Sequence, residues 1–549
     1  MKQRQLNLFA FCAPLVIVGM AAMTANATER TWVGASGGSW YVAENWDPSG
    51  VPGEKDTVIF RPDSELTVAI SGHQTQCRAG EIRFESGKTT FAYDSSSLGI
   101  YMGYMGNSTN VLYVAGDAEA VVSNRFFTTN NTRRFRKTGG GKLTIVPQTN
   151  DFWSYSSSNA FAGCDFADGE TVLAAGSGNY PLANFLLHVC SGAVVRCAAS
   201  YRTKTSQPLE VDYGGVLDCG GKAQYAKSVT GDGVVSNHYG FTIYLTGGVC
   251  TFAGQFIKWG TGPTVNFNTR PSGMSDEDWG FVIGASNTFA KSRLSQPSGT
   301  GDTIRFAPGI GDFWIKELIG STGQYLTLED TNGDPVTVRG GFYNSSSSPV
   351  PRFKGSGNFL CTMSAYIRSS DVVANMTGAL GACSGATLTI GNDTAETWPD
   401  ISGLGGFIVE DGTVALKNKN ADDAVVGGTT IFRTSSCRLT ATAGLEFCEG
   451  STVRFEIPES GLAAGVTPIS APTISFGATT RLEADVAAYR ARRKKKSQIT
   501  FATASTSLVV PDAVIAASNA RADGYRFVKS GNSLILEVAG TGGFIITFR

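Results

Sequence analysis

The amino-acid sequence contains little charge and very little histidine. Asp, Glu, Lys and Arg make up 17% of its 549 residues, whereas soluble proteins usually carry about 25%. The 45 basic residues nearly balance the 46 acidic ones, so we expect no nucleic-acid partner, because such proteins usually carry a basic excess. The three histidines, His73, His188 and His238, lie far apart, and the cysteines form no close CxxC pair. A transition-metal site and a Ser-His-Asp hydrolase are therefore not expected.

Long apolar runs are also missing after the first thirty residues. The N-terminal run, residues 6–23, follows Lys2 and Arg4 and precedes the small residues Ala25 and Ala27. This arrangement is typical of a secretory signal peptide, residues 1–27, although an uncleaved membrane anchor is an alternative. We predict an exported protein, located outside the cell, at the outer cell surface or in the periplasm, with no integral membrane segment after cleavage.

Ten cysteines remain after Cys12 is removed with the signal peptide. An even number in an exported chain permits disulfides. Cys197 and Cys219 are 22 residues apart, as are Cys361 and Cys383. Each pair either forms a bridge between neighbouring repeats or contributes to a ladder of small buried side chains.

Glycine is abundant, with 67 residues, and it punctuates a recurring phrase. A glycine and one or two small residues precede an alternating apolar stretch, which indicates a strand with one buried face. The phrase returns every 23 to 27 residues at Gly169, Gly192, Gly215, Gly385, Gly412, Gly450 and Gly477. The expected inward pairs are Val172 and Ala174, Val195 and Cys197, Leu388 and Ile390, and Val453 and Phe455.

A repeat of this length indicates a stacked array. An immunoglobulin-like string is less favoured because a sandwich domain needs about 100 residues. We predict an all-β parallel β-helix, or β-solenoid, with caps at both ends. The expected divisions are a Trp-rich N-terminal cap (28–60), solenoid repeats (61–480), a basic linker or short helix (481–498) and a C-terminal β cap (499–549).

The N-terminal cap contains Trp32, Trp40 and Trp46, followed by Pro52 and by the apolar residues 58–60. We expect the tryptophans to cover the first strand edge of the solenoid. The alternative is an aromatic platform that stacks on sugar rings.

These N-terminal residues, together with 137–143, 161–163 and 169–172, resemble secreted bacterial proteins with autotransporter-associated β-strand repeats. The resemblance implies a parallel β-helix displayed at or beyond the outer membrane, commonly as an adhesin or surface structure, and it supplies no catalytic residues. No segment resembles the translocator barrel of an autotransporter, so a passenger-like protein is expected.

Two acidic segments are candidates for chemistry. Asp330, Asn332 and Asp334 alternate as in the opening of a calcium loop, although a hairpin turn explains them equally well. Asp276 and Asp278 are candidate catalytic carboxylates, since alternate strand positions share a face, and a solvated loop is the alternative.

The basic run at residues 490–496 concentrates positive charge. It forms either a solvated linker or a contact with anionic surface glycan or lipid.

The sequence therefore favours an exported non-catalytic surface or extracellular structural protein, such as an adhesin, with host or cell-surface glycan as a possible partner. A polysaccharide lyase or glycoside hydrolase on the same scaffold and a carbohydrate-binding module are the alternatives. No cofactor other than Ca²⁺ is suggested.

Overall fold

The computed structural model describes residues 27–70, 77–92, 99–102, 110–124, 126–127, 134–146, 163–174, 186–198, 209–220, 224–226, 229–237, 243–245, 248–258, 279–295, 304–319, 325–342, 351–367, 372–373, 375–392, 401, 403–418 and 423–541. The signal-peptide prediction for 1–27 falls outside this part of the chain, apart from Ala27. The candidate carboxylates Asp276 and Asp278 also lie outside it.

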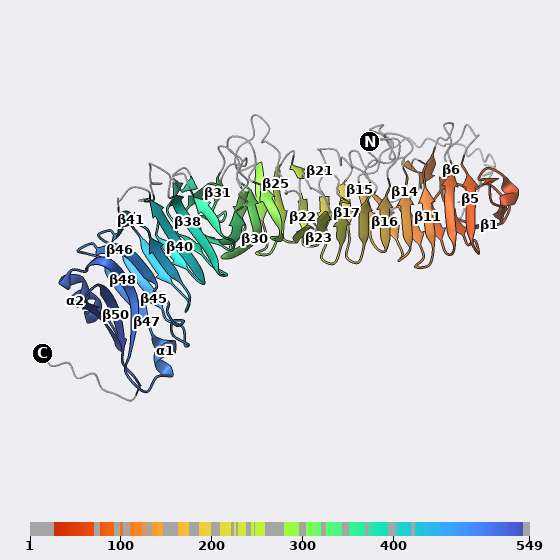
Figure 1. Cartoon of the computed structure of the whole chain (residues 1–549). Coiled ribbons are helices and arrows are strands. Elements are labelled where there is room, and N and C mark those ends of the chain that lie inside the picture. The colour runs from red at the N-terminus through yellow and green to blue at the C-terminus, as the bar shows by residue number, and fades with distance from the viewer. Residues whose placement is uncertain are drawn as a thin grey trace, which may run out of the picture.

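The chain forms a long parallel β-solenoid that bends in its C-terminal half (Figure 1), which confirms the predicted fold class. Successive strands along the chain lie on three faces, and each strand pairs in parallel with its counterpart in the next turn. In-register residues are between 18 and 28 positions apart, as for Val216 with Val234 and Lys142 with Glu170.

The first face contains β1 (Glu29–Trp32), β4 (Thr57–Phe60), β7 (Glu81–Phe84), β10 (Asn110–Val114), β13 (Arg134–Thr138), β15 (Gly163–Phe166), β17 (Leu186–Val189), β19 (Leu209–Val211), β22 (Val229–Gly231), β25 (Gly248–Phe252), β27 (Trp279–Ile283), β29 (Ile304–Phe306), β31 (Leu326–Thr327), β33 (Phe353–Gly355), β36 (Asn375–Met376), β41 (Ala424–Val426) and β44 (Leu445–Phe447).

The second face contains β2 (Gly38–Ser39), β5 (Glu65–Ala69), β8 (Lys88–Ala92), β11 (Glu119–Val122), β14 (Lys142–Ile145), β16 (Glu170–Leu173), β18 (Val194–Cys197), β20 (Val216–Asp218), β23 (Val234–Asn237), β26 (Gln255–Lys258), β28 (Phe289–Ser295), β30 (Asp312–Ile319), β32 (Thr337–Phe342), β34 (Asn358–Cys361), β37 (Leu380–Ala382), β39 (Phe407–Val409), β42 (Thr429–Phe432), β45 (Thr452–Glu456) and β47 (Arg481–Asp485).

The third face contains β6 (Cys77–Ala79), β9 (Ile100–Met102), β12 (Phe126–Phe127), β21 (Gln224–Ala226), β24 (Ile243–Leu245), β35 (Ala365–Ile367), β38 (Ala386–Asn392), β40 (Gly412–Asn418), β43 (Arg438–Ala441), β46 (Ile469–Phe476) and β48 (Ser497–Val509).

Pairing on the second face is irregular where the rod bends. Only Ile257 and Lys291 are in register between β26 and β28 in the described residues. The register then shifts within the β28–β30 pair and again within the β30–β32 pair. Such bulges bend the strand that carries them, so they account for the change of direction near β30 in Figure 1.

Antiparallel strands close both ends of the rod. β3 (Trp46–Asp47) pairs antiparallel with β1 beside the short 3₁₀ helix Ala43–Asn45. At the other end, β50 (Ser533–Val538) pairs antiparallel with β48 and with β49 (Tyr525–Ser530). The segment 481–498 contains β47, the short helix α1 (Ala487–Ala491) and the start of β48, and α2 (Asp512–Ala520) adds a helix to the C-terminal end.

The three N-terminal tryptophans pack against one another inside the first turns. Trp40 and Trp46 are buried, and their ring centroids lie 4.9 Å apart in an edge-to-face arrangement. The indole nitrogen of Trp46 donates a hydrogen bond to the carbonyl oxygen of Trp40 at 2.9 Å. Since Trp32 is also buried, the three rings fill the end of the core and do not offer a flat exposed platform.

Alternation along the strands fills the core as the glycine phrase predicts in most turns. Val195, Cys197, Leu388, Ile390, Val453 and Phe455 are all buried. The expectation for Val172 and Ala174 is wrong by one residue, because Thr171 and Leu173 face inward there. β16 pairs Glu170 with Val194, so the turn at Gly169 is one residue shorter than the turn at Gly192.

The described cysteines all carry free thiols. The register of β18 with β20 places Cys197 beside Cys219, and both are buried, which fits the ladder interpretation. The expected equivalence of Cys361 and Cys383 is wrong, since Cys361 lies opposite Ala382. Cys383 instead packs on the outer side of the sheet, in a small apolar cluster with Leu360.

Lys137 is fully buried in the turn that joins the first and second faces. Its ammonium group donates hydrogen bonds to the carbonyl oxygens of Gly139 at 2.6 Å, Gly141 at 2.7 Å and Asp168 at 2.5 Å. Burial lowers the pKa of Lys137 to about 8, so at neutral pH the group still supplies three N–H donors. Gly139 adopts a left-handed backbone with φ of 80° at this turn.

In the described part of the chain, no helix has both the length and the apolar character that crossing a membrane requires.

Replacing Trp46 with Ala should destabilise the N-terminal turns by about 3–5 kcal/mol, because it opens a cavity among buried rings. Native-state hydrogen exchange measures this locally, since solenoid turns contact mainly their neighbours. The exposed Val33 provides the control, and Val33→Ala should leave exchange unchanged. Equal effects of the two substitutions would contradict the role of Trp46.

Lys137→Met should cost roughly 3 kcal/mol of unfolding free energy, because three buried carbonyl oxygens lose their donor. Urea denaturation at pH 7 measures the change. Lys142→Met, at an exposed position of β14, is the matched control and should change stability by less than about 0.5 kcal/mol. A stable Lys137→Met protein would contradict the role of this ammonium group.

Candidate functional site

A shallow groove lies on the outer side of the second face where the rod bends, and we name it the elbow groove. It consists of two adjoining hollows of about 380 and 510 Å³ that share Trp314 and Ser384. Its lining residues are Asn287, Ala290, Asp312, Trp314, Ile315, Lys316, Arg339, Thr362, Cys383, Ser384, Glu410, Asp411, Arg433 and Thr434.

The floor of the elbow groove is low because small and apolar residues occupy the outer positions of two turns. Arg339, Leu360, Gly381 and Ile408 are in register on successive strands. A Cβ atom on Gly381 would lie 1.8 Å from the carbonyl oxygen of Ile408, so this position excludes any side chain. The Arg339 side chain consequently extends across this floor to Glu410, which is 71 residues later in the sequence.

Arg339 connects the acidic residues of the groove. Its guanidinium donates to both carboxylate oxygens of Glu410, at 2.9 Å to Oε1 and 3.3 Å to Oε2, and it also pairs with Asp312. Arg433 contacts Glu410 Oε1 at 2.6 Å. Burial opposes the charge of Arg339, but the hydrogen bonds to Glu410 and Asp312 outweigh it and raise the pKa of Arg339.

Trp314 supplies an aromatic surface beside these charges. Its side chain is 40% exposed, and the guanidinium carbon of Arg339 lies 5.5 Å from its ring centroid. Ser384 borders the same groove with φ of 56°, the one positive φ among the described non-glycine residues. Strained backbone of this kind is concentrated at functional sites.

The arrangement is better suited to binding than to acid–base chemistry. Glycoside hydrolysis needs one carboxyl group as acid and a second as base or nucleophile. In the elbow groove, Glu410 and Asp312 both accept hydrogen bonds from Arg339. Their oxygens are therefore engaged in ion pairs, whereas the Trp314 ring remains available for stacking.

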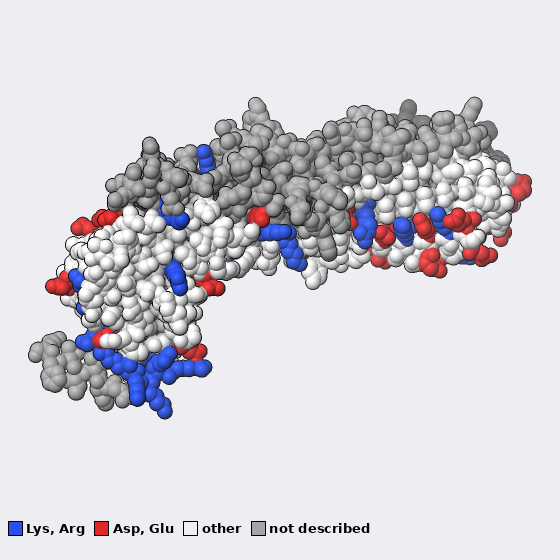
Figure 2. Space-filling view, viewed as in Figure 1, with Lys and Arg blue, Asp and Glu red and all other residues white. Residues whose placement is uncertain are grey.

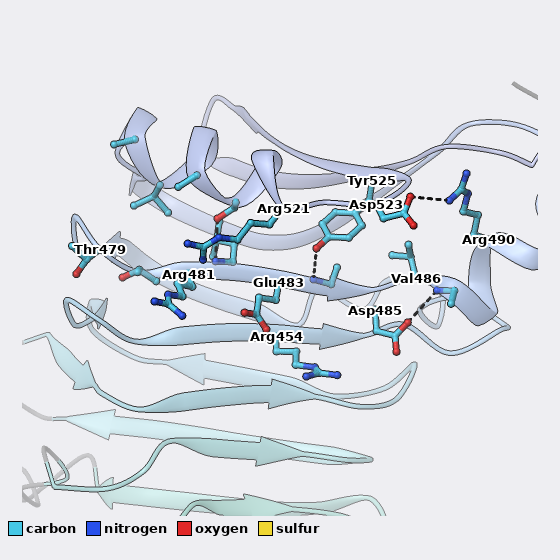
Figure 3. A pocket seen from close by; sticks show the side chains of 18 of the residues that line it. Arg454, Thr479, Arg481, Glu483, Asp485, Val486, Arg490, Arg521, Asp523 and Tyr525 are labelled. Atoms are coloured by element: carbon cyan, nitrogen blue, oxygen red, sulfur yellow. Dashed lines mark hydrogen bonds and ion pairs between the residues drawn. The ribbon is translucent and has the colours of Figure 1, made fainter. Parts of the chain in front are cut away.

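A larger hollow of about 730 Å³ separates β47 from the C-terminal cap (Figure 3). The hydroxyl oxygens of Ser518 and Tyr525 each accept a hydrogen bond at 3.1 Å from a backbone N–H of β47, at Leu482 and Ala484 respectively. These bonds satisfy part of the edge of the last second-face strand. We therefore assign this hollow to end capping.

The basic run at 490–496 forms a positive cluster at the C-terminal end of the rod (Figure 2). Several of its members have partners there. Arg490 pairs with Asp523, Arg492 with Glu459, and Lys496 with Glu537. These contacts tie the run to the cap, while Lys494 and Lys495 are exposed.

Glu537 is buried under this run and accepts hydrogen bonds from Lys496, Gln498 and Arg526. Burial by itself would raise the pKa of Glu537, but these bonds lower it to about 2. The carboxylate is therefore part of a charged network that connects β48, β49 and β50.

The calcium candidates lie in a tight turn between β31 and β32. Asp330 is buried, and its Oδ1 accepts hydrogen bonds from the backbone N–H groups of Asn332 at 2.8 Å and Asp334 at 3.0 Å. The backbone N–H of Asp330 donates to the carbonyl oxygen of Asp334 at 2.9 Å. These contacts are those of the turn alternative, in which the aspartate closes the loop without an ion.

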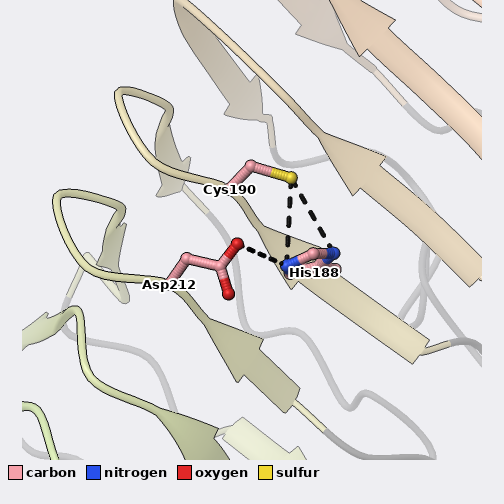
Figure 4. A group of neighbouring side chains, drawn as sticks. All are labelled: His188, Cys190 and Asp212. Atoms are coloured by element: carbon pink, nitrogen blue, oxygen red, sulfur yellow. Dashed lines mark hydrogen bonds and ion pairs between the residues drawn. The ribbon is translucent and has the colours of Figure 1, made fainter.

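One further cluster was not anticipated from the sequence. His188, Cys190 and Asp212 form the one group of three potential metal ligands found among the described residues (Figure 4). They lie on two neighbouring turns, 22 to 24 residues apart. The repeat spacing could have indicated this proximity, whereas a search for adjacent ligands could not.

Glu537→Gln should lower the unfolding free energy at pH 7 by about 2 kcal/mol. Because the folded-state pKa is depressed from 4.5 to about 2, the stabilisation is present above pH 4.5 and is lost as the pH falls toward 2. Denaturation curves of both proteins across this range measure the difference. Glu65→Gln, at an exposed residue, should produce little change, and a pH-independent effect of Glu537→Gln would contradict the prediction.

A comparison with known protein families, characterised proteins and solved structures finds no match for this chain.

Proposed function

We propose that this protein is an exported, non-catalytic rod that serves as a surface or extracellular structural protein and adheres to glycan through the elbow groove. The observation that carries the proposal is the exposed ring of Trp314 beside carboxylates that are already paired with Arg339. Such a site offers a stacking surface and fixed hydrogen-bonding groups without a free acid–base pair.

The architecture supports a structural role. One continuous hydrophobic core extends from Trp32 near one end to Val538 near the other. Antiparallel strands close both ends, which protects the solenoid from edge-to-edge aggregation. A rod of this kind presents its outer faces over a long distance and is suited to contacts spread along its length.

The sequence supports export and display. The apolar N-terminal run with its small residues at 25–27 is that of a secretory signal. The resemblance to autotransporter-associated repeats suggests an extracellular or outer-surface location, with the periplasm as the other possibility. The same resemblance favours a passenger-like adhesin.

The chemistry of the elbow groove suits a sugar ligand. The C–H face of a pyranose ring packs on an aromatic ring, as apolar surfaces generally do. The exposed Lys316 and the carboxylate of Asp312 lie within reach of the same groove, and their groups can donate to or accept from sugar hydroxyls. The ligand class is therefore a cell-surface or host glycan.

A polysaccharide lyase or glycoside hydrolase is the second candidate. It is favoured by the same cluster, because Asp312, Glu410 and Arg339 gather acidic and basic groups in one groove on a β-helix. The two candidates differ in turnover, since an enzyme must release new sugar ends.

Trp314→Ala should weaken retention on a glycan column by about 10-fold, the factor that corresponds to one lost stacking contact of about 1.4 kcal/mol. The mature protein is passed over a broad glycan panel, and both retention and release of reducing or unsaturated ends are recorded. The expected result is retention without release.

Tyr213→Ala is the matched control, because Tyr213 is an aromatic residue with 77% exposure in the N-terminal half. It should bind as the unchanged protein does. Equal loss in both variants would contradict the elbow groove as the contact site. Release of sugar ends that disappears in Glu410→Gln would replace the binding proposal with the enzymatic one.

A further inference from the structure

We propose that His188, Cys190 and Asp212 form a binding site for a thiophilic divalent transition-metal ion of the Zn²⁺ class, with Asp165 orienting the histidine. The proposal concerns the N-terminal half of the rod and does not depend on the glycan-binding function of the elbow groove.

The fold brings the three ligands together through the solenoid register. His188 lies on β17 and Cys190 directly follows that strand. Val189 between them is buried, so the two ligands project from the outer side of the face. Val189 pairs with Val211 on β19, which places Asp212 beside Cys190 on the next turn.

The distances are close to those of a tetrahedral site. His188 Nε2 lies 2.9 Å from Asp212 Oδ2 and 3.9 Å from Cys190 Sγ (Figure 4). The three ligand atoms lie within 4.8 Å of one another. A tetrahedral zinc ion separates nitrogen, oxygen and sulfur ligands by roughly 3.4–3.6 Å, so shifts of less than about 1 Å would complete the geometry.

A carboxylate on the preceding turn holds the imidazole from behind. Asp165 on β15 is in register with His188, and its Oδ1 lies 3.0 Å from His188 Nδ1. Asp165 is buried and pairs with Arg134 on β13. A carboxylate at the second ring nitrogen is the usual support of a metal-binding histidine, since it fixes the tautomer that offers Nε2 to the ion.

The donor set selects the class of ion. Thiolate and imidazole favour Zn²⁺ and related ions, whereas Ca²⁺ takes six to eight oxygen ligands. The Asp212 side chain is 48% exposed, so a fourth position is open toward solvent. Three protein ligands with one open position match the coordination of zinc sites that accept a further ligand.

The charge of the site fits a divalent cation. A Cys190 thiolate and the Asp212 carboxylate together neutralise the ion, and Arg134 already balances Asp165. Glu210, in register with His188 on β19, adds a further acidic group on the same outer side.

Cobalt(II) titration of the chelator-treated, reduced mature protein tests the proposal. Co²⁺ is the probe because a thiolate ligand gives it a near-ultraviolet charge-transfer band, and tetrahedral coordination gives it strong visible bands. We expect both bands to saturate at one equivalent, Zn²⁺ to remove them and Ca²⁺ to leave them unchanged. Absence of the bands at saturating Co²⁺ would overturn the proposal.

Variants identify the ligands. Cys190→Ser should abolish the charge-transfer band, while Cys448→Ser, at another partly exposed cysteine, should retain it. Asp165→Asn should keep the band but weaken Co²⁺ binding by 10- to 100-fold. Circular dichroism confirms that each variant is folded. A band that persists in folded Cys190→Ser, or is lost in folded Cys448→Ser, would overturn the assignment.

Discussion

Every other property of this rod depends on the parallel register between successive turns. Each strand supplies the backbone hydrogen bonds of the next, so a residue at one position lies against its counterpart about one repeat later. Inside, this stacks rings on rings, as for Phe432 and Phe455, whose centroids lie 4.9 Å apart in nearly parallel planes. Outside, the same register forms charged columns, such as Arg196 between Glu170 and Asp218. The elbow groove and the His188 cluster are assembled in the same way, from side chains that share an outer column.

The register also explains why the ends differ in construction from the middle. A parallel stack leaves one strand edge open at each end. At the first turns, buried indole rings and β3 close the core. At the last, Ser518 and Tyr525 accept hydrogen bonds from β47, and β50 reverses the strand direction beside β48. Glu537 then joins three strands of this closure through its charged partners. Uncharged and charged contacts thus perform the same task at opposite ends.

The sequence predicted the architecture because glycine and alternation are local signals. The positions of Val195, Leu388 and Phe455 in the core follow directly from them. Val172 was misassigned because the turn before β16 is one residue shorter, and the feature that occupies that turn, the buried ammonium of Lys137, lies in another strand. The candidate sites were harder still. Arg339 and Glu410 are separated by 71 residues and by turns of unequal length, so their contact requires the exact register of each turn. His188 and Asp212 required only one such step, and their proximity was within reach of the repeat spacing.

The single in-register pair between β26 and β28 has a mechanical consequence. Under tension along the rod, the turns act as springs in series, and every interface experiences the same force. The interface with the fewest paired residues then yields first, and the described pairing of the second face is thinnest there. The rod would extend at this joint, next to the bulged strands of the bend, while the N-terminal stack and the C-terminal cap kept their structure. Anchored at one end and bound at the other, such a molecule would behave as two stiff segments joined by a hinge that opens under load.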